Sequence, residues 1–93
     1  MTNIVGRAEV IQIFRLDNGA TIASCKILEG LVRINSLTRI SRQSTLLTQS
    51  RVTILRRFRD NVLEVKAEKE CGISFEGFND LQCGDRLEFL EGS

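Results

Sequence analysis

Residues 51–72 read RVTILRRFRDNVLEVKAEKECG, and this stretch decides the fold of the 93-residue chain. An apolar run ending at Phe58 has the pattern of a strand, a turn signal follows at residues 60–61, and a second apolar segment leads to Gly72. The end of the first strand carries three arginines around one aromatic ring: Arg56, Arg57, Phe58 and Arg59. The sequence therefore predicts a basic strand end set opposite a glycine.

The rest of the chain repeats this pattern of short runs rich in Val, Ile, Leu, Phe and Thr, bounded by Gly, Asn, Asp and Ser. We expect six strands, at residues 5–16, 20–28, 36–42, 46–58, 71–75 and 86–91. Proline is absent, and residues 62–69 fit a short strand or a helical turn. Short strands joined by tight turns predict an all-β barrel or sandwich, and a closed barrel is favoured because closure removes exposed edges.

Turn signals separate these expected strands. Residues 17–19 (Asp-Asn-Gly) should end the first strand, and residues 29–30 (Glu-Gly) the second. Residues 43–45 (Gln-Ser-Thr) should join the third strand to the fourth. The fourth strand is long enough to bend or break near residues 49–50.

Length and composition predict one soluble globular domain. A chain of 93 residues with 42% hydrophobic and 27% charged residues can bury a single core. No apolar run approaches the roughly 18 residues that a membrane span requires, and residues 1–10 lack the pattern of a signal peptide. We therefore expect a monomer that does not contact a membrane.

The cysteines predict no metal site. Three are present, widely spaced, in a chain without histidine: Cys25, Cys71 and Cys83. We expect reduced thiols, as in a cytosol-like compartment. Alternation places Cys71 on one strand face with Ile73 and Phe75, and Cys25 likewise alternates with apolar residues. This pattern favours core thiols over a Cys71 nucleophile activated by Arg57.

No catalytic constellation is present in the sequence. Without histidine the commonest general base is missing, and no GxSxG, HExxH or GxxxxGK[ST] motif occurs. We therefore expect a non-catalytic domain that holds neither a metal ion nor a cofactor of its own.

The net charge of +1 hides an asymmetry along the chain. Residues 30–59 contain seven arginines and no acid, whereas residues 60–93 contain nine acids against three basic residues. A polyanion would therefore meet one part of the domain and be repelled by another. Folding could equally bring the two halves together and neutralise them, and charge alone does not decide between these alternatives.

The basic cluster itself has two interpretations. Guanidinium groups bind phosphate oxygens through paired hydrogen bonds, and an aromatic ring can stack on a base. Alternation would place Arg57 and Arg59 on one face, opposite Phe58 and its neighbour Arg56, unless the strand ends there. The local sequence favours the simpler interpretation that Phe58 is a core residue flanked by arginines. Gly72 indicates either a bulge or a surface that a ligand approaches closely.

Four stretches of the chain are similar to one known family. They read GRAEVIQIFRLDNGATIASCKILEGLVR, LRRFRDNVLEV, ECGISFEGFND and CGDRLEFLE, in the family's order and spacing, and the distance from RRF to ECG is the most specific feature. In these residues the chain resembles the C-terminal domain of bacterial-type translation initiation factor 2. The resemblance implies a closed six-stranded antiparallel β-barrel similar to domain II of elongation factor Tu, within a larger translational GTPase.

The resemblance also implies a function. Such a domain binds the acceptor end of formylmethionyl initiator tRNA, including the blocked amino group, and helps to place it on the small ribosomal subunit. The binding residues carried over by position are Cys25, Arg56, Arg57, Phe58, Arg59, Glu70, Cys71 and Gly72. GTP and Mg²⁺ would be bound by the parent factor, in the bacterial cytoplasm or in an organelle matrix or stroma. The alternative is a non-catalytic protein-interaction barrel that docks onto the ribosome or onto other domains of its parent.

The chain departs from the family at residues 35–50. Asn35 and Ser50 stand where the family usually has glycine, and Arg42-Gln43-Ser44 replaces an Arg-Asp-Gly turn. Asparagine tolerates the left-handed conformation, so the turn at Asn35 can survive. The tip of the hairpin at residues 43–44 is expected to differ in shape.

Overall fold

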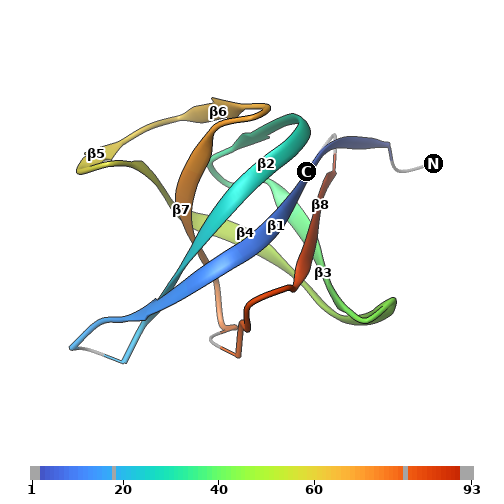
Figure 1. Ribbon diagram of the computed structural model, residues 1–93, viewed down its shortest axis with the longest axis horizontal. Coiled ribbons are helices and arrows are strands. Elements are labelled where there is room, and N and C mark those ends of the chain that lie inside the picture. Colours follow the sequence, from blue (N-terminus) through green and yellow to red (C-terminus); the bar gives the residue numbers. More distant parts are fainter. Residues whose placement is uncertain (1–2, 18, 79, 91–93) are drawn as a thin grey trace.

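Antiparallel pairing joins six strands into a closed ring (Figure 1). The computed structural model describes residues 3–17, 19–78 and 80–90. Its eight strands are β1 (Ile4–Arg15), β2 (Thr21–Arg33), β3 (Leu37–Arg42), β4 (Thr45–Arg57), β5 (Asp60–Asn61), β6 (Glu64–Lys66), β7 (Glu70–Phe75) and β8 (Arg86–Leu90). The ring runs β1-β8-β3-β4-β7-β2 and closes through the β1–β2 pairing. This confirms the predicted all-β fold and the closed six-stranded antiparallel barrel.

The two remaining strands are short additions outside the ring. β5 pairs with the end of β4, and β6 pairs with the end of β2. The segment 62–69, which the sequence left open, therefore contains a short strand followed by a turn in which Glu68 has a φ of 65°. β4 is continuous, so the expected bend or break at residues 49–50 does not interrupt it. Asn18 of the first predicted turn and Glu91 of the last predicted strand lie outside the described residues.

The second strand is longer than its sequence predicts. The expected end at residues 29–30 is wrong, because β2 continues to Arg33. Gly30 has a φ of 67° and lies opposite Gly6 of β1. A Cβ atom on Gly30 would collide with the Val5 carbonyl oxygen, so glycine is needed where the strands approach this closely. Beyond this point β2 pairs with β6.

Two further turns follow from local conformation. Asn35 has a φ of 68°, which confirms that asparagine adopts the left-handed conformation at this position. Gln43 and Ser44 both have positive φ and form the tip between β3 and β4, where Arg42 pairs with Thr45.

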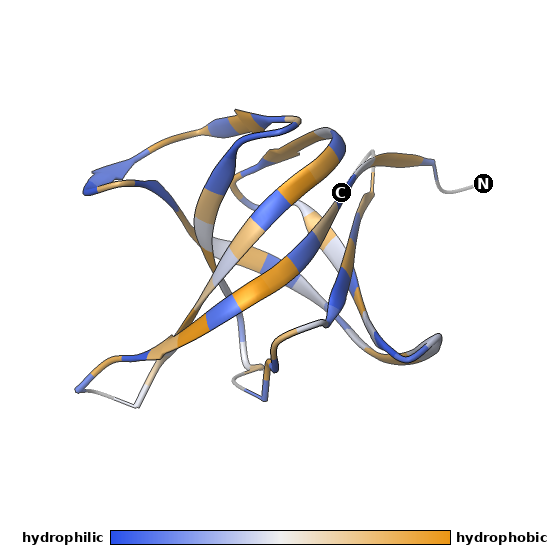
Figure 2. Ribbon diagram, viewed as in Figure 1, coloured by the Kyte–Doolittle hydropathy of each residue, from blue (hydrophilic) through white to orange (hydrophobic). Residues whose placement is uncertain are grey.

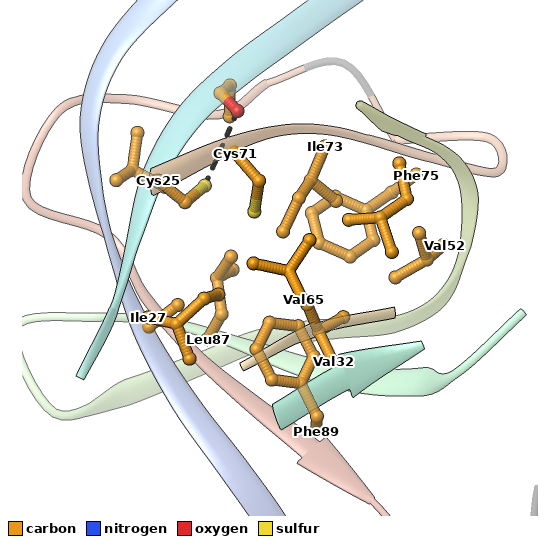
Figure 3. Close-up of a cluster of buried hydrophobic side chains, with 14 of the residues drawn as sticks. Cys25, Ile27, Val32, Val52, Val65, Cys71, Ile73, Phe75, Leu87 and Phe89 are labelled. Carbon is orange, nitrogen blue, oxygen red and sulfur yellow. Dashed lines mark hydrogen bonds between the residues drawn. The ribbon is translucent and has the colours of Figure 1, made fainter. Parts of the chain in front are cut away.

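Alternating side chains fill the barrel interior. Apolar and polar residues alternate along the strands in Figure 2, and the apolar set converges on one core in Figure 3. The predicted inward faces are confirmed, since Ile73 and Phe75 are buried in β7 and Leu87 and Phe89 are buried in β8. Ser74 is buried as well, and its hydroxyl donates a hydrogen bond of 2.7 Å to the Thr21 carbonyl oxygen. This hydrogen bond links β7 to β2 beside the apolar core.

A buried ion pair fastens the loop between β7 and β8 to β3. Asp85 is fully buried, and its two carboxylate oxygens accept hydrogen bonds from Nε and Nη2 of Arg42 at 2.8 and 3.0 Å. Arg42 Nη2 also donates to the Asp80 carbonyl oxygen at 2.7 Å, and the Gln82 backbone N–H donates to Asp85 at 2.9 Å. Among the described residues, the hydrogen-bond partners of this carboxylate come from β3 and from its own loop.

We expect Arg42→Ala to lower the Tm by more than about 5 °C, because the buried Asp85 carboxylate would lose its cation. Arg33→Ala is the matched control, since Arg33 forms a largely exposed ion pair with Glu64 and should lower the Tm much less. Thermal unfolding followed by circular dichroism measures both variants. Equal shifts would show that the Arg42 pair does not anchor the loop.

Candidate nucleic-acid interface

The basic cluster lies on a hairpin that leaves the barrel. Arg57 of β4 pairs with Asp60 of β5, so Phe58 and Arg59 form a two-residue turn. Phe58 is 91% exposed and has a φ of 59°. The interpretation of Phe58 as a core residue is therefore wrong: β4 ends at Arg57, and the ring no longer follows the alternation of the strand. The hairpin presents its ring and its arginines to solvent.

Gly72 lies in the outer face of the barrel, directly beside this hairpin. In the strand register it is flanked by Ser24 of β2 and Arg56 of β4. Because glycine has no side chain, the backbone of β7 is uncovered between these two neighbours. A pocket of about 350 Å³ occupies this position, and we call it the Gly72 pocket. The two predicted features, the basic strand end and the glycine, therefore meet in space.

Most of the predicted binding residues surround this pocket. Five of them line it: Arg56, Phe58, Glu70, Cys71 and Gly72. Arg57 lies next to it, since its Nε donates to the Glu70 carbonyl oxygen at 3.3 Å and its guanidinium carbon lies 5.2 Å from the centre of the Phe58 ring. That second distance is typical of a cation–π contact. Arg59 is exposed at the hairpin turn.

Cys25 lies behind the pocket rather than in it. Its side chain is fully buried in β2 opposite Cys71 of β7, and its thiol donates a hydrogen bond to the Ala23 carbonyl oxygen at 3.4 Å (Figure 3). A ligand on the outer face cannot reach this thiol. Cys25 therefore supports the strand beneath the pocket.

Burial governs the chemistry of both core thiols. It raises the pKa of Cys71 to about 12, although the nearby Arg57 guanidinium partly opposes this effect. Burial, with a smaller contribution from Cys71, raises the pKa of Cys25 well above its ordinary value. Both thiols are therefore neutral at physiological pH, which removes the basis for a Cys71 nucleophile.

Three further residues line the Gly72 pocket and were not predicted: Phe14, Ile22 and Ser24. Phe14 of β1 pairs with Ile22 of β2, and together they form an apolar wall opposite the hairpin. Because the residues on either side of Ile22 in β2 are inward-facing, alternation alone would have placed Ile22 outside. The sequence contained no signal that β2 lies next to β7, so this wall could not be assigned to the pocket.

The fold neutralises only part of the basic segment. Of its seven arginines, Arg33 pairs with Glu64 and Arg42 pairs with Asp85 and Asp80. The other five have no ion pair within the described residues: Arg39, Arg51, Arg56, Arg57 and Arg59. Three of these five belong to the hairpin beside the Gly72 pocket. Positive charge therefore exceeds negative charge there, with three arginines against Asp60 of the hairpin and Glu70 of the pocket.

Neither a metal centre nor a membrane-spanning helix is found among the described residues. Among the described residues, no three His, Cys, Asp or Glu side chains gather as metal ligands would. None of the described segments forms a helix long and apolar enough to cross a lipid bilayer.

Two curated relatives are similar in sequence to this chain over nearly its whole length. The chain is 44% identical over 89 residues to translation initiation factor IF-2 of Ruthia magnifica subsp. Calyptogena magnifica and 37% identical over 89 residues to IF-2 of Maricaulis maris, covering 96% of the chain in each case. It spans only about a tenth of these relatives, 11% and 10% of their lengths. No protein-family model matches the chain.

One solved structure shows the same fold. GDP-bound aIF5B from Aeropyrum pernix superposes on 94% of this chain with a TM-score of 0.76, using 16% of its own length. The sequence identity is 16%, so this likeness concerns the fold alone.

Replacing Phe58 with glycine should not lower the Tm and should raise it slightly. A left-handed conformation costs a non-glycine residue about 1–2 kcal/mol, and the exposed ring contributes little packing. Arg59→Gly is the matched control, because Arg59 lies outside the positive-φ region and glycine there adds only flexibility to the unfolded chain. Thermal unfolding compares the two. A loss of stability in Phe58→Gly that exceeds the loss in Arg59→Gly would show that the ring supports the fold.

The thiols should react in a fixed order. Cys83 is exposed, whereas Cys25 and Cys71 are buried and protonated. A maleimide or iodoacetamide at pH 8 should therefore modify only Cys83 in the folded protein, and all three thiols after unfolding in urea. Mass spectrometry of the labelled peptides identifies the sites. Rapid labelling of Cys71 in the folded protein would contradict this assignment.

Proposed function

We propose that the chain acts in translation initiation by binding the acceptor end of formylmethionyl initiator tRNA. The basis is its homology, over nearly its whole length, to a segment of bacterial translation initiation factor IF-2. The observation that supports the proposal is the Gly72 pocket, where an uncovered backbone meets a basic hairpin carrying an exposed aromatic ring. The proposal concerns this domain alone, since the chain spans about a tenth of its relatives.

Arginines would bind the phosphates of the tRNA end. Arg56 lines the pocket, and Arg57 and Arg59 extend the positive charge along the hairpin. None of the three has an ion pair within the described residues, so a phosphate would not have to displace an acid. Binding should therefore depend on salt concentration.

The pocket would receive the terminal nucleoside and its acyl group. Gly72 lets a ribose or an ester lie against the backbone of β7, because no side chain stands between Ser24 and Arg56. The wall formed by Phe14 and Ile22 lies opposite the hairpin and offers an apolar surface to a methionine side chain. Phe58 on the hairpin can cover the same ligand from the other side.

Charge at the pocket would favour a blocked amino group. The hairpin arginines repel the positive charge of a free ammonium, whereas a formylated amine is neutral. Glu70 is the acid that lines the pocket and would attract an ammonium, so it opposes this preference. A free ammonium would also lose part of its hydration without full replacement, at a cost on the order of 1–3 kcal/mol.

We further propose that this domain is non-catalytic and monomeric and works with the ribosome in the cytoplasm. Within a longer factor, GTP and Mg²⁺ would be bound by other segments. The resemblance to the family and the missing catalytic motifs support this proposal. The alternative of a protein-docking barrel makes a different prediction for tRNA binding, which the next experiment measures.

The chain should bind formylmethionyl-tRNA more tightly than methionyl-tRNA, by about fivefold or more. Gly72→Val should weaken the binding of the formylated tRNA at least tenfold, because its side chain would fill the uncovered floor. The nearest atom to a Cβ at this position is Cγ2 of Ile22 at 3.0 Å, the end of a side chain that can shift, so the fold should survive. Protection of the aminoacyl ester from hydrolysis measures the binding.

A pair of arginine variants separates site binding from general charge. Arg57→Ala should weaken binding and reduce the slope of log K against log salt by about 1. Arg51→Ala removes an arginine from the same strand, away from the Gly72 pocket, and should change binding much less. Unchanged tRNA binding in both Gly72→Val and Arg57→Ala would support the protein-docking alternative instead.

A further inference from the structure

A second pocket lies on the other side of Arg56. Its volume is about 310 Å³, and we call it the Leu63 pocket. Five apolar and three polar residues line it: Ile34, Ile54, Leu55, Val62 and Leu63, with Thr53, Arg56 and Asn61. It lies between β4 and the segment that leads from β5 to β6. These two short strands lie on the side of the barrel away from the chain ends (Figure 1).

Arg56 belongs to both pockets. In the register of the sheet it stands between Gly72 of β7 and Asn61 of β5. Its Nε donates to Asn61 Oδ1 at 3.0 Å, which holds the side chain in place and leaves the terminal nitrogens of the guanidinium for a ligand. β7 and β5 are two strand spacings apart, about 10 Å. A ligand that crosses Arg56 from the Gly72 pocket therefore enters the Leu63 pocket.

Leu63 presents an exposed apolar surface at this pocket. Its side chain is 77% exposed, although its backbone carbonyl oxygen accepts a hydrogen bond of 3.0 Å from the Ile34 N–H. The residue is therefore fixed in position while its side chain faces solvent. A planar apolar group such as a nucleobase would cover Leu63 and the neighbouring Ile54.

The lining of the Leu63 pocket fits a nucleotide, because one cation stands beside an apolar surface. Arg56 is the one charged residue that lines it within the described part of the chain. Glu64, the next residue after Leu63, is already paired with Arg33 at 2.9 Å. Asp60 lies opposite Arg57 in the hairpin. In a single-stranded nucleic acid, phosphates alternate with bases. This spacing matches an arginine that lies beside an apolar surface.

We propose that the Leu63 pocket holds the base of the nucleotide that precedes the terminal nucleoside, with the phosphate between the two nucleotides bound by Arg56. This inference rests on the proposed function, which places the terminal nucleoside in the Gly72 pocket. It gives the domain a second contact along the single-stranded end of the tRNA. Binding energy would then come from the nucleotides as well as from the formylmethionyl group.

The test compares two ligands that differ only in length. One is adenosine carrying formylmethionine through a hydrolysis-resistant 3′-amide, and the other is the same group on the trinucleotide C-C-A. The chain should bind the trinucleotide about tenfold more tightly than the nucleoside. Leu63→Ser should abolish most of this gain and leave the affinity for the nucleoside unchanged. Leu46→Ser, at a leucine that is 52% exposed in β4 near its turn with β3, is the matched control and should keep the gain.

The outcomes distinguish the two proposals. If the chain binds neither ligand, the proposed function fails and this inference fails with it. If it binds the nucleoside but gains nothing from the trinucleotide, the function stands and the Leu63 pocket is not a nucleotide site. A gain that survives in Leu63→Ser would come from the added phosphates alone and would also overturn the proposal. Isothermal titration calorimetry at fixed salt concentration measures all of these affinities.

Discussion

The candidate site depends on one constraint, the pairing of β7 with β2 on one side and β4 on the other. This pairing sets Gly72 between Ser24 and Arg56, which are distant in the sequence. A slip of one residue would turn Gly72 into the core and expose Cys71 or Ile73 on the outer face. The closed ring prevents such a slip, because each strand is held on both sides and the buried face of β7 is apolar.

Structural features that depend on neighbouring residues were predictable from the sequence. Alternation within one strand identified the buried faces of residues 71–75 and 86–91, since period-2 burial is a local property. The resemblance implied a turn at Asn35, and asparagine tolerates the left-handed conformation that this turn requires. Features that depend on tertiary approach were missed. Gly30 resembled a turn glycine, but it lies within β2. Glycine is needed there because β1 passes too close for any side chain.

The same distinction applies to the site. The resemblance identified the hairpin and Gly72, and five of the eight residues carried over line one pocket. Phe14 and Ile22 could not be found in this way, because they join the pocket only through the pairing of β1 with β2 and of β2 with β7. The local sequence pattern, unlike the resemblance, gave the wrong burial for Phe58. An aromatic residue at the end of an apolar run is usually buried, and here the strand ends one residue earlier.

The hairpin after β4 is difficult to explain by folding alone. Phe58 holds a backbone conformation that favours glycine, and its ring gains almost no burial in return. Three arginines surround the ring, Arg56, Arg57 and Arg59, against two acids, Asp60 of the hairpin and Glu70 of the Gly72 pocket. Local rules are most often broken where a protein binds something outside itself. An anionic partner with an apolar group would cover the ring and neutralise the arginines together, which neither the core nor the surrounding strands can do.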